Sequence, residues 1–148
     1  MNLYLDTSAL IKRYCFEDGS MFLSRVLAPA AIRGSSVLLY AEVAAALHRK
    51  VREGMLPADF GFQWRQFEAD YAGLSTIAID MSLLAAVPDL CARHPLRSAD
   101  AIHLASALAC QSRTSAVTFV AADQRLLAAA AAEGMAIIDV SHDAKDGL

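Results

Sequence analysis

A short apolar run near the start of the chain ends abruptly in polar residues. Leu3-Tyr4-Leu5 is followed at once by Asp6-Thr7-Ser8, where an amphipathic segment begins. This order is typical of a buried strand that passes directly into a helix, with Asp6 at the carboxyl end of the strand. Ligands of an open parallel sheet bind at that end of the strands. Acids that follow other strands are therefore expected to meet Asp6 at one edge of the sheet.

The rest of the sequence alternates between apolar runs and helical patterns. Further strands are expected at 36–39, 75–79, 116–121 and 135–140. Helices are expected at 8–15, 20–27, 40–53, 57–72, 82–93, 99–112 and 124–133. This alternation predicts an α/β fold with a mainly parallel central sheet of about five strands and right-handed crossovers.

The composition limits the class of protein. The 148 residues suit one domain, 1–148, in which about 141–148 are expected to be a solvated tail, and 56% of them are hydrophobic. We expect no membrane span, because charged residues interrupt every long apolar run. Asp6 also interrupts the position of a signal peptide, so a cytoplasmic location is predicted. The net charge of −3 argues against coating nucleic acid by bulk charge, but it allows a local basic groove.

Four acids lie at the predicted helix starts, namely Asp6, Glu42, Asp100 and Asp123. Each alone is explained by helix capping, since carboxylates accept the free N–H groups of a first turn. Together at one edge of a sheet, however, they repel one another unless a cation lies between them. A set of oxygen donors without cysteine or histidine at ligand spacing suits Mg²⁺ or Mn²⁺ better than zinc. Such ions activate water against phosphodiesters, so metal-dependent hydrolysis is the predicted reaction class.

Other polar residues near these acids have two interpretations each. Thr7 and Ser8 could contact a phosphate or cap the first helix. Arg49 falls on the same helical face as Glu42, and Arg97 adjoins the predicted edge, so both are phosphate candidates, although basic residues at a helix end are usually solvated. His103 follows Asp100 on one helical face; it is either a general base or, as we expect, a packed histidine bonded to a backbone carbonyl.

Four segments of the chain carry a family resemblance. They are Leu3–Leu10, Tyr40-Ala41-Glu42-Val43, Leu96–Ala105 and Phe119–Leu126, the last followed by Glu133-Gly134. In this order they resemble the signature segments of PIN domains, and in length and layout the chain is similar to the VapC-type toxins of bacterial toxin–antitoxin pairs. Relatives often carry serine or threonine at the position of Ala121.

The resemblance implies a PIN-like three-layer α/β/α fold and an endoribonuclease that depends on Mg²⁺, for which Mn²⁺ can substitute. It implies that Asp6, Glu42, Asp100 and Asp123 line the metal site, with Asp6 and Asp100 as the firmest ligands. It also implies a homodimer that a cognate antitoxin holds inactive. Two alternatives remain open: an RNA-processing nuclease without an antitoxin, and a catalytically silent binding module whose acids only cap helices.

Overall fold

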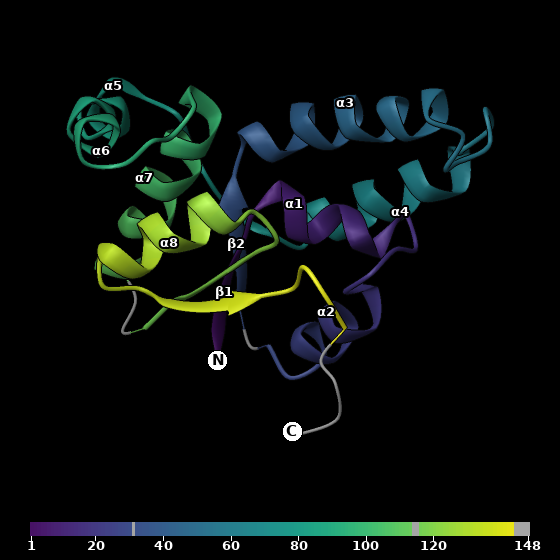
Figure 1. Cartoon of the computed structure of the whole chain (residues 1–148), viewed down its shortest axis with the longest axis horizontal. Coiled ribbons are helices and arrows are strands. Elements are labelled where there is room, and N and C mark those ends of the chain that lie inside the picture. Colours follow the sequence, from purple (N-terminus) through teal and green to yellow (C-terminus); the bar gives the residue numbers. More distant parts are fainter. Residues whose placement is uncertain (31, 114–115, 144–148) are drawn as a thin grey trace.

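Five parallel strands form the central sheet of the protein, in the order β3-β2-β1-β4-β5 (Figure 1). The computed structural model describes residues 1–30, 32–113 and 116–143. The strands are β1 Asn2–Leu5, β2 Ile32–Ser36, β3 Ser75–Ile77, β4 Thr118–Ala121 and β5 Ala136–Asp139. The predicted α/β class with a parallel sheet is therefore confirmed.

Helices cover both faces of the sheet. One face carries α1 Thr7–Leu10, the 3-10 helix η1 Ile11–Arg13, α2 Ser20–Leu27, α3 Leu38–Arg52 and α4 Gly61–Ala72. The other carries α5 Met81–Leu84, α6 Val87–Arg93, α7 Ser98–Arg113 and α8 Gln124–Ala132. Side chains alternate along β1, so that Leu3 and Leu5 pack in the first layer and Tyr4 packs in the second. The fold is the expected three-layer sandwich.

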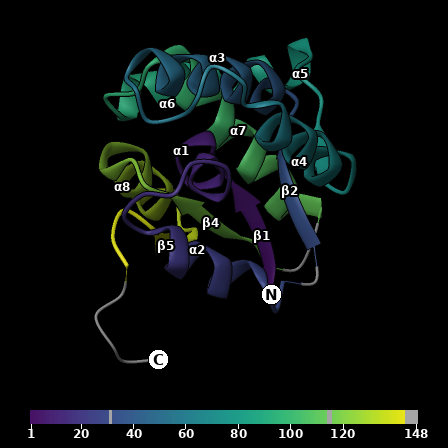
Figure 2. The same ribbon diagram turned by 90° about the vertical axis from the view of Figure 1, so that its right-hand side faces the viewer.

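The strand order reverses next to β1. The chain leaves β1 toward β2 and β3 on one side, and it returns to the other side of β1 with β4 and β5. The carboxyl ends of β1 and β4 therefore flank a switch point, which is where open α/β sheets bind ligands. In Figure 2, β1 runs upward from the N-terminus toward α1 and α7. Asp6 directly follows β1, and its N–H donates to the Val120 carbonyl at 3.0 Å.

The expected strand at 36–39 is wrong, because the strand lies earlier and α3 begins at Leu38. Residues 32–36 lack an apolar run, but the small side chains among them fit a closely packed part of the sheet. The buried Ser35 hydroxyl donates to the Leu5 carbonyl at 2.7 Å, and a Cβ on Gly34 would lie 3.2 Å from the Ser75 carbonyl oxygen. Small residues allow this close packing, while the apolar run belongs to α3. Glu42 consequently lies beyond the first turn of its helix.

Other boundaries differ for local reasons. The helix expected from 57 begins at Gly61, and the one expected at 82–93 is broken between α5 and α6, where Pro88 occupies the first turn of α6. Gly54 and Gly134 follow their helices with φ of +74° and +83°, as expected for residues that end a helix. None of the described helices is both long and apolar enough to cross a bilayer.

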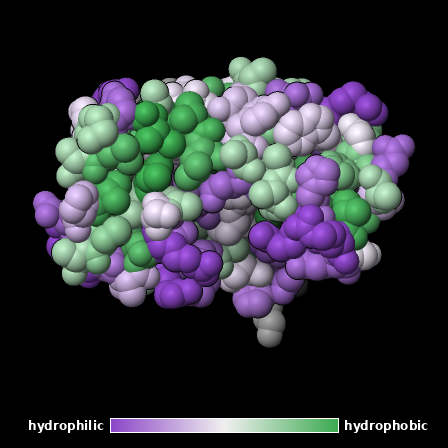
Figure 3. Space-filling model, turned by 90° about the horizontal axis from the view of Figure 1, so that it is seen from above, coloured by the Kyte–Doolittle hydropathy of each residue, from purple (hydrophilic) through white to green (hydrophobic). Residues whose placement is uncertain are grey.

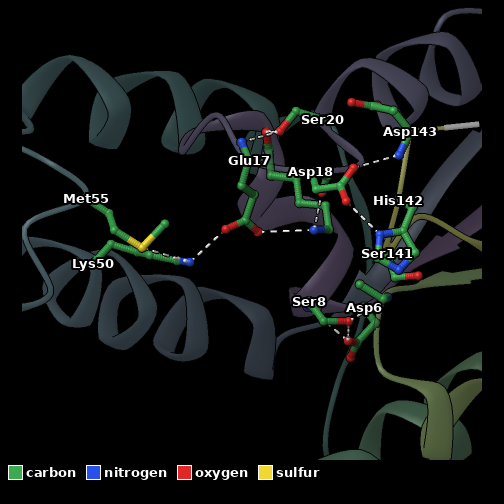
Figure 4. Close-up of polar contacts among 12 residues, drawn as sticks. Asp6, Ser8, Glu17, Asp18, Ser20, Lys50, Met55, Ser141, His142 and Asp143 are labelled. Atoms are coloured by element: carbon green, nitrogen blue, oxygen red, sulfur yellow. Dashed lines mark hydrogen bonds and ion pairs between the residues drawn. The ribbon is translucent and has the colours of Figure 1, made fainter.

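The segment expected to be a solvated tail begins at 141, and residues 144–148 of it lie outside the described ranges. His142 Nδ1 lies 2.6 Å from Asp18 Oδ2, and the Asp143 N–H donates to Asp18 Oδ1 at 2.9 Å. The Asp143 carboxylate accepts the Phe22 N–H at 2.8 Å. Residues 142 and 143 are thus held against the start of α2 (Figure 4).

Candidate active site

Two of the four predicted acids cap helices at the switch point. Asp6 precedes α1, and its Oδ2 accepts the Ser8 N–H at 2.9 Å. Asp123 precedes α8, and its Oδ1 accepts the N–H groups of Arg125 and Leu126 at 2.9 and 3.1 Å. Each cap uses one oxygen of the carboxylate, so the second oxygen is left for another partner.

The Ser8 hydroxyl joins the two capped helices. Its Oγ lies 2.5 Å from Asp6 Oδ2 and accepts the Ala122 N–H at 2.9 Å. Figure 4 shows Ser8 and Asp6 side by side. Because Ala122 directly precedes Asp123, this hydroxyl fixes the spacing between the two acids. Sequence reasoning gave Ser8 a role in phosphate contact or capping, whereas the structure shows that it orients a carboxylate.

Glu42 reaches the same edge from α3. Its Oε1 accepts the Thr7 hydroxyl at 2.8 Å and lies 2.5 Å from His103 Nε2. Burial alone raises the pKa of Glu42, but the hydrogen bond and charge of His103 and the hydrogen bond from Thr7 outweigh burial and lower this pKa. Glu42 is therefore held as a carboxylate, and helix capping does not explain its position.

His103 lies beneath the acids, on α7, and is 1% exposed. Its Nδ1 lies 2.9 Å from the Tyr4 hydroxyl, and its Nε2 lies 3.8 Å from Asp6 Oδ1. The expected backbone carbonyl partner is wrong, because both ring nitrogens meet side chains. Burial lowers the pKa of His103, but the hydrogen bond to Glu42 and the charges of Asp6, Glu42 and Asp100 together raise it.

Asp100 lies in the first turn of α7, as predicted, and its Oδ2 accepts the Arg97 N–H at 3.2 Å. Burial raises the pKa of Asp100, and the charges of Asp123 and Asp6 raise it further, although the Arg97 N–H and charge act in the opposite direction. The charges of Asp6 and Asp123 thus act on Asp100, as expected for acids at one edge of the sheet, and their convergence into one metal site stays a prediction.

One carboxylate oxygen of each aspartate is not taken up by a backbone N–H at a helix start. Within the described residues, Asp6 Oδ1, Asp100 Oδ1 and Asp123 Oδ2 accept no hydrogen bond. No three His, Cys, Asp or Glu side chains in residues 1–30, 32–113 and 116–143 are grouped as a ready-made metal site. The edge therefore offers carboxylate oxygens of the kind that hard divalent cations prefer, without a preformed cage.

The predicted phosphate contacts lie at different distances from these acids. The Thr7 and Ser8 hydroxyls are bonded to Glu42 and Asp6. Arg97 is exposed and close enough for its charge to lower the pKa of Asp100. Arg49 is exposed in the last turn of α3, about 10 Å along the helix from Glu42. Arg97 is accordingly the cation nearer to the acids.

Tyr4 contacts His103 of the candidate site, and sequence reasoning missed this contact because Tyr4 was taken only as part of a buried strand. A tyrosine in such a strand needs a partner for its hydroxyl, and this requirement was the available signal. The partner, His103, lies 99 positions away in the sequence. The spacing of residues could not identify it.

The fold and the four acids define a PIN domain. The family model for the PIN domain matches residues 3–138, and the chain belongs to this family. Two Mycobacterium tuberculosis proteins, Ribonuclease VapC45 of strain CDC 1551 / Oshkosh and Ribonuclease VapC49 of strain ATCC 25618 / H37Rv, are each 35% identical to it over 111 residues, which are 72% of this chain and 75% of the relative.

Solved structures agree with this fold at low sequence identity. A toxin-antitoxin complex from Klebsiella pneumoniae contains a chain that superposes with a TM-score of 0.67 at 15% identity, covering 97% of this chain and 100% of its own. VapBC-1 from nontypeable Haemophilus influenzae matches with a TM-score of 0.58 at 12% identity, covering 95% and 99%. Both support the three-layer architecture.

Proposed function

We propose that the protein is a metal-dependent endoribonuclease that hydrolyses RNA phosphodiester bonds and acts as the toxin of a toxin–antitoxin pair. The observation that carries this proposal is the arrangement of Asp6, Asp100 and Asp123. Each uses one carboxylate oxygen for a backbone N–H and keeps the other oxygen without a hydrogen bond among the described residues. Acids that only capped helices would not need to converge at a switch point.

The donor set fits Mg²⁺, with Mn²⁺ as a substitute. Asp6 and Asp100 would be the firmest ligands, and Glu42 and Asp123 would complete the site directly or through water. Burial and the charges of Asp123 and Asp6 raise the pKa of Asp100, because they disfavour its charged form, and a bound cation would offset both effects. When bound, the ion supplies an activated water and offsets the charge of the phosphate.

RNA is the proposed substrate because the two curated relatives are named ribonucleases. The chain's own contribution is to orient the carboxylates through Thr7, Ser8 and His103 and to hold a phosphate with Arg97. A local contact of this kind suits a protein with a net charge of −3 better than bulk attraction does. The same chemistry would serve an RNA-processing nuclease, from which only the antitoxin distinguishes a toxin.

The proposed antitoxin has a suitable docking surface. A hollow of about 650 Å³ lies between the η1–α2 segment and α4, and its lining includes Phe16 and Phe62, which are 81% and 70% exposed. Exposed Met21 adds to this apolar surface, and Arg25 adds positive charge. An amphipathic antitoxin segment with apolar and acidic side chains would match this hollow. The solved structural neighbours include toxin-antitoxin complexes.

The proposed homodimer would use a different face. Apolar surface lies at the left of Figure 3, over the end of the molecule that holds α5 and α6. Met81 of α5 is 77% exposed there. A two-fold axis would bring this patch against its copy. Gel filtration with light scattering tests the proposal, because Met81→Glu should give a monomer, and a dimer that survives the change would point to another face.

Cleavage of a mixed RNA pool by the purified chain, with and without Mg²⁺ or Mn²⁺, tests the proposed activity. We expect cleavage that needs the metal and is lost in Asp6→Asn and Asp100→Asn, while circular dichroism shows both variants folded. Asp89→Asn is a matched control, because Asp89 is an exposed first-turn acid of α6, outside the site. Cleavage that persists in both site variants would overturn the proposed site. Calorimetry that shows no metal binding would favour the silent module.

A further inference from the structure

A continuous chain of polar groups runs from the buried Tyr4 and His103 to the partly exposed Glu42. The Tyr4 hydroxyl meets His103 Nδ1 at 2.9 Å, and His103 Nε2 meets Glu42 Oε1 at 2.5 Å. We infer that Tyr4 is a positioning residue that acts through His103 to fix Glu42 and Asp6 for metal binding. The inference rests on the proposed function, since it concerns the same metal site.

Tyr4 is itself held rigidly. It belongs to the central strand β1 and is 0% exposed. Its ring stacks on Phe119 of β4, with centroids 5.4 Å apart and an interplanar angle of 11°. The same ring meets the edge of His103 at 6.0 Å and 78°. The ring that carries the hydroxyl is thus held between two neighbouring strands of the central sheet.

The hydrogen-bonding chemistry fixes which groups donate and which accept along the contacts from Tyr4 through His103 to Glu42. A carboxylate only accepts hydrogen bonds, so the contact with Glu42 requires a proton on His103 Nε2. The Tyr4 hydroxyl occupies the other ring nitrogen and sets the rotation of the imidazole about its side chain. A rotated ring would point a carbon at both partners.

The fixed imidazole relates acids from two different elements. Glu42 Oε1 is held from two sides, by His103 and by Thr7. The same His103 nitrogen lies 3.8 Å from Asp6 Oδ1, the oxygen that the helix cap leaves unused. The polar chain therefore controls the distance between a carboxylate after β1 and a carboxylate on α3. Partners that orient metal ligands in this way usually change metal affinity or activity about 10- to 100-fold when they are removed.

Packing alone is the competing explanation, because Tyr4 also fills space in the core. Phenylalanine would fill the same space without the hydroxyl, so Tyr4→Phe separates the two explanations. Tyr14→Phe is a matched control: Tyr14 is also buried, and its hydroxyl donates to Asp70 at 2.9 Å, away from the acids. Both variants lose one hydroxyl, but only the first loses the contact with His103.

Titration calorimetry with Mg²⁺ and with Mn²⁺, on the full chain, is the primary measurement. We expect Tyr4→Phe to weaken metal binding about tenfold and to lower kcat for RNA cleavage while KM changes little. Tyr14→Phe should match the wild type in both measurements. Wild-type metal affinity in Tyr4→Phe would overturn the inference and leave the proposed function intact. A wild-type chain that neither binds metal nor cleaves RNA would overturn both.

Two further comparisons exclude a general loss of structure. In a His103→Leu background, Tyr4→Phe should weaken metal binding no further, because Tyr4 acts on both acids through His103. His103→Gln keeps an N–H that can reach Glu42, whereas His103→Leu keeps only the volume. We expect the glutamine variant to bind metal more tightly than the leucine variant. Equal metal affinities of the two His103 variants would contradict a positioning role, even if Tyr4→Phe folds poorly. Additive losses of metal affinity in the double variant would contradict it as well.

Discussion

The Ser8 hydroxyl lies 2.5 Å from Asp6 Oδ2 and at the same time accepts the N–H of Ala122 at 2.9 Å. One small side chain thus orients the acid that follows β1 and fixes the segment that leads to Asp123. The proposed metal site and the joint between α1 and α8 therefore share this single group.

Replacing Ser8 by alanine tests this double role. We expect Ser8→Ala to lower the free energy of unfolding by about 1–2 kcal/mol, because the Ala122 N–H loses its partner. Metal-dependent cleavage should fall as well, since Asp6 keeps only one of its two hydrogen bonds. Ser24→Ala is the control, because within the part of the chain that the structure describes the Ser24 hydroxyl donates only to the Ser20 carbonyl of its own helix, at 3.1 Å. Equal effects of both changes on cleavage, measured beside urea unfolding, would contradict the orienting role.

The two proposed interaction faces provide controls for each other. Phe62→Glu should weaken binding of the protein encoded by an adjacent small gene at least tenfold, about 1.4 kcal/mol, because it places a charge in an apolar hollow. Met81→Glu should leave that affinity unchanged but alter the oligomeric state. Surface plasmon resonance and light scattering on both variants check this prediction. An unchanged affinity for Phe62→Glu would move the docking surface elsewhere.

The sequence was informative where local chemistry decides the structure. Asp6 and Asp123 were correctly placed at helix starts, because an N-cap is recognised from residues within one turn. The three-layer arrangement followed from the alternation of strands and helices. The rule for parallel sheets placed Asp6 and Asp123 at the carboxyl ends of the neighbouring strands β1 and β4, whereas Glu42 reaches this edge from within α3 and not from a helix start.

The sequence was not informative where distant segments decide. Strand β2 contains Arg33, Gly34 and two serines, and it is a strand because β1 and α7 pack closely against it, which no local propensity reveals. The partner of His103 was missed for the same reason. Glu42 lies 61 positions away and Tyr4 lies 99 positions away, so only the folded chain brings them together.

Glu17 provides a prediction for pH dependence. Its carboxylate meets Lys50 Nζ at 2.7 Å and Lys12 Nζ at 3.2 Å (Figure 4). Burial raises the pKa of Glu17, but the hydrogen bonds and charges of Lys50 and Lys12 outweigh burial and lower this pKa below 4.5. A lowered pKa in the folded state means that the stabilisation is complete above the unfolded value and is lost as the pH falls through the folded value.

The wild type should therefore be more stable than Glu17→Gln at neutral pH, by about 1 kcal/mol for a partly buried network. This difference should shrink as the pH is lowered through the region below 4.5. Urea unfolding at a series of pH values measures this difference. Glu68→Gln is a control, because Glu68 accepts an exposed hydrogen bond from Tyr40 and has no ion pair among the described residues. A difference that does not depend on pH would contradict the ion-pair explanation.

Substitutions at Gly19 and Gly54 distinguish two effects of adding a side chain at positive φ: backbone strain and a steric clash. Both have positive φ, +89° and +74°. A Cβ on Gly54 would meet nothing within 4 Å, whereas one on Gly19 would clash with the Val140 carbonyl. Gly54→Ala should cost about 1–2 kcal/mol from backbone strain alone. Gly19→Ala should cost more, because the chain after β5 must also move away from the start of α2. Equal losses of unfolding free energy in the two variants, measured by chemical unfolding, would contradict this, because the segment at Val140 would then move aside with no added free-energy penalty.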